Sequence, residues 1–230
     1  MMFHAFPLVL AALLAAVSLP RGGWDGLDEA HPLKVDKAEK EIRVLADLQP
    51  RAFTRRWFNS MPGHHAVVWK GGGAARKALL AAYVEDTTFH DAMVSIGAKP
   101  GNNLTQKTWS ERFNKTSRAP STKIEGSPVG VWVWWDGLEK PLPLKDLFKD
   151  PGGKGIHLRF GGNKALIPVW RSGCVVCLQS CPGSKIGNRS YTIRDYVDGK
   201  ATFTLNEKTV PPGKRKAVVL FRLLGTGKAE

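Results

Sequence analysis

Short segments in which apolar and polar residues alternate recur along the chain, and they constrain its fold more than any other feature. In Glu41–Leu48, apolar Ile42 and Val44 share one face with Ala46 and Leu48. Such a period of two is typical of a half-buried β-strand. Further strand-like segments are 64–70, 156–160, 191–197, 201–205 and 217–224, while the apolar run 77–84 fits a strand or a helix. Because these strands outnumber helices and do not alternate regularly with them, the sequence predicts an α+β fold with a mostly antiparallel sheet.

Two of these strand regions carry additional signals. Val129–Trp135 is the strongest strand, and it has apolar residues on both faces. That pattern predicts a central strand covered on each side. The pair Asp198-Gly199 stands between segments 191–197 and 201–205, where it predicts a hairpin turn.

One helix is clear at about residues 88–97. Its apolar residues recur with helical spacing, at Phe89, Ala92, Met93 and Ile96. Thr88 and Asp91 match a looser capping box at its start, and Gly97 suits a cap at its end. A short second helix is expected in 141–148, and the polar segment 101–128 is expected to be a long loop.

The first residues have the composition of an export signal. Phe3–Leu19 is almost entirely apolar, too short for a comfortable membrane span, and Ala16-Val17-Ser18 offers small residues for cleavage. We therefore expect a signal peptide at 1–18, or an uncleaved anchor, then a linker at 19–39, a domain at 40–224 and a tail at 225–230. The body is expected in the periplasm or outside the cell, with a membrane-anchored form facing the periplasm as the alternative.

The chain is strongly basic, with a formal net charge of +14. Such a charge fits a solvated basic surface, and it would also attract an acidic partner, for example an acidic protein or a redox partner. Nucleic acid is not expected, because no zinc-finger spacing, RNP-type aromatic signature or basic-region heptad is present. Contact with a membrane is expected only through the N-terminal segment, if that segment is not cleaved.

All three cysteines lie in one short motif, Cys174-x2-Cys177-x3-Cys181-Pro182. A ferredoxin-type run needs four thiolates with the spacing C-x2-C-x2-C-x3-C-P, and Arg171 occupies the first position here. A [4Fe–4S] cluster at these cysteines therefore needs a fourth ligand from elsewhere, for which the candidates are a remote histidine such as His157, a solvent molecule or a partner subunit.

Three other interpretations of the motif stay open. One disulfide with one free thiol suits an exported protein with an odd number of cysteines, with Cys174–Cys177 or Cys177–Cys181 as the bond. A loop that short gains little chain entropy, so the bond would act in redox chemistry or local shape. A zinc ion could be held by the three thiolates and one of His64, His65 or His157. Buried inert thiols are the remaining interpretation.

The sequence does not predict an enzyme, and it offers no catalytic residue. It contains no Gly-x-Ser-x-Gly elbow, no His-Glu-x-x-His helix and no phosphate-binding loop. A nucleophilic role for Cys181 or Cys174 would need a histidine within hydrogen-bond reach.

Two stretches together resemble the YdjY-type domain family of bacterial proteins. The first runs from Ala78-Leu79-Leu80 through Phe89-His90-Asp91-Ala92 to Ile96-Gly97-Ala98-Lys99-Pro100-Gly101, and the second runs from Ser172-Gly173-Cys174 to Cys181-Pro182 and on to Ser190–Val197. The resemblance covers roughly residues 40–224. The ferredoxin-like label of this family implies an iron–sulfur electron carrier with Cys174, Cys177 and Cys181 as ligands. Our first expectation is an exported, non-catalytic domain with a redox- or metal-capable cysteine knuckle, and the electron carrier is the alternative.

Overall fold

The computed structural model describes residues 26–55 and 63–225. Its strands are β1 (Leu33–Asp36), β2 (Glu41–Leu48), β3 (His65–Trp69), β4 (Leu80–Ala82), β5 (Val129–Trp134), β6 (Leu142–Pro143), β7 (Phe148–Lys149), β8 (Leu158–Phe160), β9 (Cys174–Cys177), β10 (Ile186–Asn188), β11 (Thr204–Leu205) and β12 (Arg215–Leu223). Its α-helices are α1 (Pro50–Thr54), α2 (Asp86–Ser95), α3 (Gln106–Ser110), α4 (Ile167–Trp170) and α5 (Ile193–Val197). Short 3-10 turns are η1 (Ala75–Lys77), η2 (Ala119–Ser121), η3 (Leu144–Leu147) and η4 (Lys164–Leu166).

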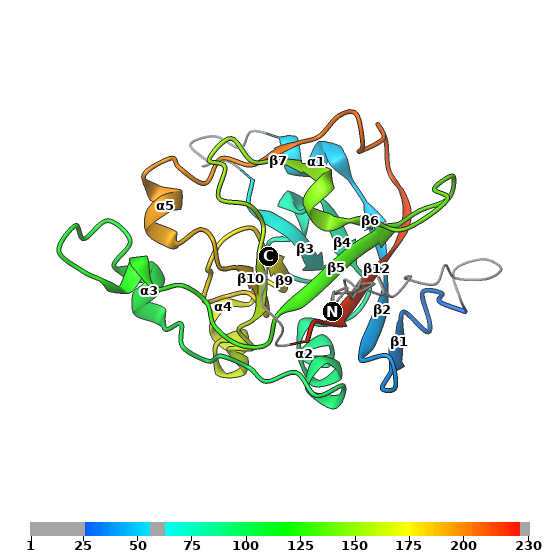
Figure 1. Ribbon diagram of the computed structural model, residues 1–230, viewed down its shortest axis with the longest axis horizontal. Coiled ribbons are helices and arrows are strands. Elements are labelled where there is room, and N and C mark those ends of the chain that lie inside the picture. The colour runs from blue at the N-terminus through cyan, green and yellow to red at the C-terminus, as the bar shows by residue number, and fades with distance from the viewer. Residues whose placement is uncertain (1–25, 56–62, 226–230) are drawn as a thin grey trace, which may run out of the picture.

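One long, curled sheet organises these elements (Figure 1). Its strand order is β6-β5-β12-β2-β4-β3-β9-β10-β8, and β1 adds to β2 outside this path. The pairs β3–β4 and β9–β10 are parallel, and the other pairs in the described residues are antiparallel. The architecture is thus a mixed α and β fold dominated by a sheet, with few and short helices.

The sheet curls far enough for its two ends to meet. Pro128, just before β5, forms an isolated antiparallel bridge with Arg159 of β8. The backbone N–H of Phe160 donates to the carbonyl of Ser127 at 2.9 Å. Gly126 makes this approach possible, because a Cβ atom at that position would lie 2.0 Å from the carbonyl oxygen of Phe160. Gly126 also has a φ of 114°, a conformation that favours glycine.

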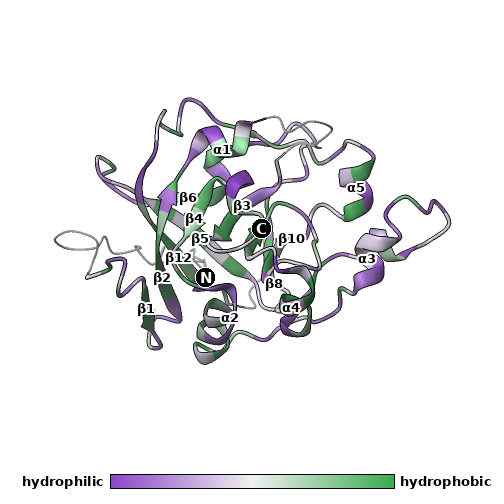
Figure 2. Ribbon diagram, turned by 180° about the vertical axis from the view of Figure 1, so that it is seen from behind, coloured by the Kyte–Doolittle hydropathy of each residue, from purple (hydrophilic) through white to green (hydrophobic). Residues whose placement is uncertain are grey.

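Hydrophobic residues gather in the central strands, as Figure 2 shows. The largest buried cluster takes side chains from β2, β4, β5, β9 and β12 and from α2. A second cluster contains the three cysteines with Val68, Ala74, Ala78 and Ile193. The cysteines therefore lie in a small core of their own beside the main one.

Strand β2 has the predicted bounds, but its polar face is buried as well. Glu41 is 1% exposed and accepts hydrogen bonds from Arg43 at 2.7 Å and from Arg222 of β12 at 2.7 Å. Asp47, also buried, lies among lysines. Alternation located the strand correctly, but it could not show that arginines and lysines of neighbouring strands would cover its carboxylates.

The main helix confirms the prediction, with two differences at its start. It spans Asp86–Ser95, and Glu85 rather than Thr88 is the N-cap. Gly97 follows its end with a φ of 94°, as a C-terminal cap requires. The expected short helix in 141–148 is the 3-10 turn η3 between β6 and β7, and the expected loop at 101–128 contains α3.

The predicted strand at 191–197 is wrong, because these residues form α5. Thr192 accepts a hydrogen bond from the backbone N–H of Asp195, and the Asp195 carboxylate accepts one from the N–H of Thr192 in return. This reciprocal cap favours a helix over the extended conformation. Gly199 accordingly follows the helix end with a φ of 72° instead of forming a hairpin. Only Thr204–Leu205 of the next segment is a strand, and it pairs with β7.

Strand β5 is not central in the sense expected. It lies between β12 and the two-residue β6, near one end of the sheet. Its valines are buried, while Trp132 and Trp134 are half-buried beside a small cluster that contains Leu27 and Leu45. The tryptophan face is therefore covered only in part.

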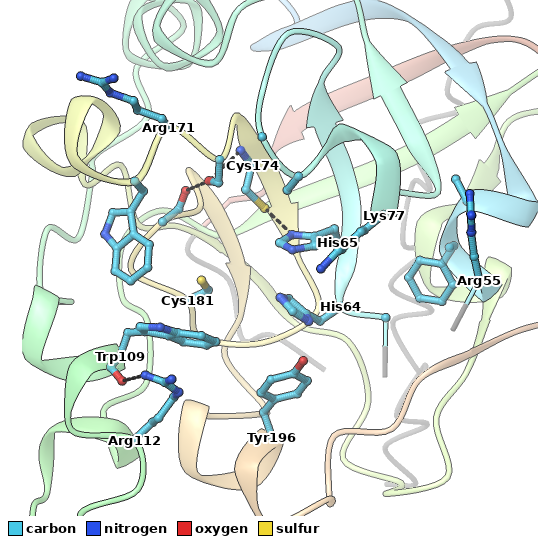
Figure 3. Close-up of a pocket in the computed structure, with 18 of the residues that line it drawn as sticks. Arg55, His64, His65, Lys77, Trp109, Arg112, Arg171, Cys174, Cys181 and Tyr196 are labelled. Atoms are coloured by element: carbon cyan, nitrogen blue, oxygen red, sulfur yellow. Dashed lines mark hydrogen bonds between the residues drawn. The ribbon is translucent and has the colours of Figure 1, made fainter. Parts of the chain in front are cut away.

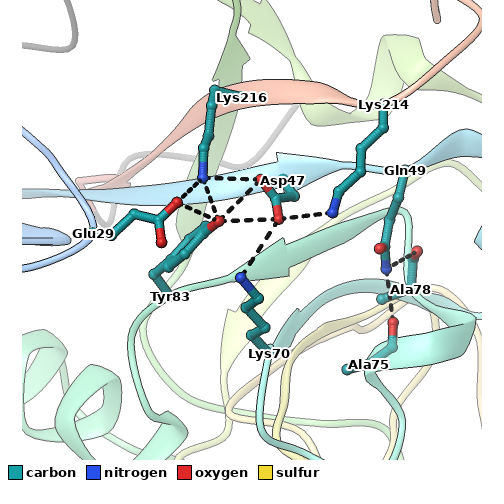
Figure 4. Close-up of polar contacts among 9 residues, drawn as sticks. All are labelled: Glu29, Asp47, Gln49, Lys70, Ala75, Ala78, Tyr83, Lys214 and Lys216. Carbon is teal, nitrogen blue, oxygen red and sulfur yellow. Dashed lines mark hydrogen bonds and ion pairs between the residues drawn. The ribbon is translucent and has the colours of Figure 1, made fainter.

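The expected linker at 19–39 is partly structured. Leu33–Asp36 forms β1 on β2, and Leu27 is 5% exposed. Glu29 pairs with Lys216 at 2.5 Å in a network that also contains Tyr83 and Asp47 (Figure 4). The folded body therefore begins earlier than residue 40.

The expected export segment at 1–18 lies outside the described residues. Within the described ranges, no helix is long and apolar enough to cross a membrane.

Candidate functional site

Two matched irregularities in neighbouring strands bring the cysteines to one side of the sheet. His65 of β3 faces Cys177 of β9, and Val68 faces Cys174, with register shifts between these pairs. A bulge lets an extra residue stand opposite one partner, so it changes the regular alternation of side chains. As a result, Val175 and Val176 both join the main core, whereas Cys174 and Cys177, three residues apart, both join the cysteine cluster.

The turn before β9 is held against the glycine run after β3. Gly73 and Ala74 donate their N–H groups to the carbonyls of Arg171 and Ser172, each at 3.0 Å. A Cβ atom on Gly72 would lie 2.5 Å from the Cα of Gly173, so this contact requires glycine. The run 71–73 thus fixes where the cysteine segment begins.

A cavity of about 590 Å³ opens onto the cysteines (Figure 3). Cys174 and Cys181 line it, together with the two histidines His64 and His65. Its aromatic residues are Phe53, Trp109, Phe113, Trp170 and Tyr196, and its cations are Arg55, Lys77, Arg112 and Arg171. Trp109 and Trp170 pack edge to face with ring centroids 6.0 Å apart. The volume falls within the range typical of small-molecule sites.

The three thiols differ in exposure and in acidity. Cys181 is 8% exposed, Cys174 is 1% exposed and Cys177 is fully buried. Burial raises the pKa of Cys177 well above its ordinary value, and hydrogen bonds with the thiols of Cys174 and Cys181 raise it further. The hydrogen bond from Cys177 lowers the pKa of Cys181, against the effect of burial, with help from the N–H groups of Gly183 and Ser184 and the charge of Lys185. Cys181 is therefore the thiol best suited to carry negative charge.

His65 contacts the third thiol. Its Nδ1 lies 3.4 Å from the Sγ of Cys174 (Figure 3). Burial lowers the pKa of His65 well below its ordinary value, and the neighbouring His64 and Lys77 lower it further. The imidazole is therefore neutral at pH 7, and it is a weak base toward Cys174.

A buried ion pair lies next to the cysteine turn. Lys185 Nζ is 2.7 Å from the carboxylate of Asp86 at the start of α2, and both side chains are nearly excluded from water. The backbone N–H of Lys185 donates to the carbonyl of Cys174 at 3.3 Å. This pair ties the main helix to the segment that carries Cys181.

The predicted site residues are only partly brought together. The three cysteines form one cluster, and His64 and His65 line the same cavity with ring centroids 4.0 Å apart. His157, the candidate fourth ligand, lines a different cavity and hydrogen-bonds to Ser190 at 2.7 Å. The histidine against the cysteines is therefore His65.

In the described part of the chain, no group of three or more His, Cys, Asp or Glu side chains is placed so that it could hold a metal ion. Arg171 replaces the first thiolate of a ferredoxin run, and its side chain points away from the cysteines (Figure 3). The [4Fe–4S] cluster and the zinc ion stay predictions from the sequence.

Several residues of the cavity were not predicted from the sequence. Trp109 and Arg112 come from the region 101–128 that we expected to be a loop, and Tyr196 comes from the segment expected to be a strand. The guanidinium of Arg112 lies 4.6 Å from the ring centroids of both Trp109 and Phe113. The sequence signal that could have indicated them is the closeness of Arg112 to two aromatic residues, Trp109 and Phe113, along the chain.

Comparisons with known proteins agree with the resemblance noted in the sequence. The chain is 29% identical to the protein YdjY of Escherichia coli (strain K12) over 201 residues, which cover 87% of this chain and 82% of that protein. No solved structure matches the chain. The model of the YdjY domain matches residues 33–222, which include β1 and all three cysteines. The chain therefore belongs to the YdjY domain family.

Proposed function

We propose that this chain is an exported domain with a thiol redox site, in which Cys177 and Cys181 interconvert between two thiols and one disulfide. One observation carries the proposal: the fully buried Cys177 packs in one small cluster with both other cysteines, and Cys181 of that cluster lines a cavity. Two cysteines can form a disulfide when their Cα atoms lie within about 7 Å of each other.

The two cysteines have different parts in this chemistry. Cys181 is the more exposed thiol, and its surroundings favour the thiolate, which is the reactive form. Cys177 has no exposed surface, so it reacts only with a sulfur that is already inside the protein. We therefore assign Cys181 as the thiol that meets the oxidant and Cys177 as the one that closes the disulfide.

The positions of the cysteines favour Cys177–Cys181 over Cys174–Cys177. Cys174 is held by the contact with His65 and by its place in β9, whereas Cys181 lies in the turn between β9 and β10. A bond across so short a loop adds little stability, so it suits a reversible role. The expected export signal agrees with this chemistry, because disulfides persist in oxidising compartments.

Counting free thiols at defined redox potentials tests the proposal. We expect the full chain to have three alkylatable thiols when reduced and one when oxidised, with the bond mapped to Cys177–Cys181 by mass spectrometry. Cys174→Ser keeps the transition, and Cys177→Ser and Cys181→Ser each abolish it. A bond that includes Cys174, or three free thiols at every potential, would contradict the assignment.

Metal analysis of the same samples distinguishes the proposed thiol redox site from a metal-binding role of the cysteines. Iron with labile sulfide in an anaerobic preparation, lost in Cys177→Ser, would support the ferredoxin-like electron carrier that the family label implies. Zinc lost in the same variant would support a structural metal knuckle. Either result would replace the disulfide as the main role of these cysteines.

An enzyme with Cys174 as nucleophile has one contact in its support, the 3.4 Å approach of His65 Nδ1 to the sulfur. The lowered pKa of this partly buried histidine argues against it, because a weak base removes a thiol proton poorly. Cys174 is also 1% exposed, less than Cys181. If Cys174→Ser alone abolished reaction with iodoacetamide, the enzyme alternative would gain over the redox site.

A further inference from the structure

We propose that the cavity over the cysteines selects small, negatively charged disulfides as the oxidants of Cys181. The inference rests on the proposed thiol redox function, and it adds the chemical class of the molecule that enters. Three features of the cavity carry it: the sign of its charges, its walls, and the depth at which the thiols lie.

The charges that line the cavity have one sign. Among the described residues that line it, four are lysine or arginine and none is aspartate or glutamate, although the side chain of one of the four, Arg171, points away from the cysteines (Figure 3). Lys77 and Arg112 lie on opposite sides of the cavity in Figure 3. A cleft lined by cations raises the local concentration of anions and speeds their association by about 10-fold to 1000-fold. The formal charge of +14 on the whole chain acts in the same direction.

One cation is held in place over the aromatic wall. Arg112 donates a hydrogen bond from its guanidinium to the carbonyl of Trp109 at 3.1 Å, and the same group lies 4.6 Å from the ring centroids of Trp109 and Phe113. An arginine ordered in this way loses little conformational freedom when it binds a carboxylate. It is suited to fix one end of an anionic molecule in the cavity.

The walls suit the apolar, polarizable part of a disulfide. Trp109 and Trp170 line the cavity with Cys181, and Tyr196 lines it from α5. Sulfur makes favourable contacts with aromatic rings. A carboxylate-bearing disulfide could thus place its sulfurs against the rings and its charges near Lys77 and Arg112.

The depth of the thiols limits the size of the partner. Cys181 is 8% exposed and Cys177 is fully buried, so the sulfur that Cys181 attacks must enter the cavity. A volume of about 590 Å³ accommodates a peptide of a few residues but not a folded protein surface.

The reaction balances with this partner alone. The Cys181 thiolate attacks one sulfur of the small disulfide, whose S–S bond breaks and releases one thiolate. The Cys177 sulfur then attacks the Cys181 sulfur of the mixed disulfide, and the second small thiolate leaves with the proton that Cys177 gives up. The small disulfide gains two electrons and becomes one thiolate and one thiol, while the two cysteines become one disulfide.

Three disulfides that differ in charge test the inference on the full, reduced chain. Glutathione disulfide is anionic, 2-hydroxyethyl disulfide is neutral and cystamine is cationic at pH 7. We expect glutathione disulfide to consume the thiols at least about tenfold faster than cystamine at low ionic strength, with a difference that shrinks as salt is added. The rates come from acid-quenched alkylation and mass spectrometry.

Charge-neutral variants locate the effect. Lys77→Gln and Arg112→Gln should each slow oxidation by glutathione disulfide several-fold and leave oxidation by the neutral disulfide unchanged. Lys107→Gln is the matched control, since it removes the same charge from an exposed position of α3 outside this cavity. The neutral disulfide also reports whether a variant has disturbed the site as a whole.

The outcomes distinguish this inference from the function on which it rests. Equal rates for the three disulfides, or equal effects of Lys77→Gln and Lys107→Gln, would overturn the selection of anions and leave the redox site in place. If none of the three disulfides oxidises the wild-type thiols, the redox function itself fails and the inference fails with it.

Discussion

Lys185 and Asp86 form an ion pair of 2.7 Å with both side chains nearly excluded from water. Removing one partner of such a pair leaves an uncompensated charge in the interior. We therefore expect Asp86→Asn to lower the free energy of unfolding by about 3–5 kcal/mol, as measured by urea denaturation.

An exposed carboxylate provides the control for this prediction. Asp91 pairs with Lys164 at 2.6 Å on the surface, and Asp91→Asn should cost less than about 1 kcal/mol. The double variant Asp86→Leu with Lys185→Met should be more stable than Asp86→Asn, because no charge remains buried. A cost for Asp86→Asn no larger than that for Asp91→Asn would show that the pair is not desolvated.

The buried carboxylate of Asp47 predicts a loss of stability in acid. Burial opposes its ionisation, but hydrogen bonds from Lys216 and Lys214 outweigh burial and lower the pKa of Asp47 below its ordinary value of 3.8 (Figure 4). A carboxyl group with a lower pKa in the folded state stabilises the protein above its ordinary pKa, and this contribution is lost as the pH falls through the folded value. Stability should therefore fall as the pH drops below about 4.

The variant Asp47→Asn separates the contribution of this carboxylate to the pH dependence of stability from the contributions of the other carboxylates. The variant should be less stable at pH 7 by about 2 kcal/mol, between the values for exposed and buried pairs, and its stability should depend less on pH below about 4. Urea denaturation at a series of pH values gives both quantities. Glu207→Gln, at an exposed position outside this cluster, should leave the pH dependence unchanged, and an unchanged dependence for Asp47→Asn would contradict the prediction.

Regular periodicity made a large part of the fold predictable. The bounds of β2 agree with the alternation in Glu41–Leu48, β12 overlaps the segment 217–224, and α2 overlaps the helix expected at 88–97. These elements have consistent spacing over at least eight residues, and each buries an apolar face. The position of the three cysteines in one cluster also followed from their closeness in the sequence.

The candidate site depends on features with no regular period. The bulges in β3 and β9 turn Cys174 and Cys177 to one side of the sheet. In a regular strand, side chains alternate, so two residues three positions apart would lie on opposite sides. Trp109, Arg112 and Tyr196 reach the cavity from segments far away in the sequence. The role of Thr192 was missed because its cap with Asp195 competes with an apolar pattern that also fits a strand.

The cap of α5 predicts a link between local stability and the cysteines. Thr192→Val removes the side-chain oxygen that accepts from the N–H of Asp195, a change that typically costs about 1 kcal/mol. Because Tyr196 of this helix lines the cavity, opening of α5 should also expose Cys181. We expect a lower urea midpoint and faster alkylation of Cys181, whereas Ser110→Ala, at an exposed position of α3, should change neither. Loss of stability without faster alkylation would mean that α5 does not shield the thiol.

The glycine contact beside β9 predicts which of two alanine substitutions is more harmful. Gly173 and Gly199 have similar positive φ values, 69° and 72°, so alanine at either position should cost about 1–2 kcal/mol for the backbone conformation. At Gly199 a Cβ atom would have nothing within 4 Å, but at Gly173 it would lie 2.7 Å from the Cα of Gly72. Backbone atoms cannot move aside cheaply, so Gly173→Ala should cost about 1–3 kcal/mol more than Gly199→Ala in urea denaturation.

The same pair of variants also tests whether this contact positions the cysteines. Only Gly173→Ala should push residues 171–173 away from the glycine run, and Cys174 follows directly in the chain. Its distance to His65 should then grow, and the alkylation of Cys174 in the folded protein should become faster. Gly199→Ala should leave that rate unchanged, since no atom of residues 26–55 or 63–225 lies within 4 Å of the added methyl group. Equal stability and equal alkylation rates in the two variants would mean that the close approach of Gly72 and Gly173 does not hold the cysteine segment in place.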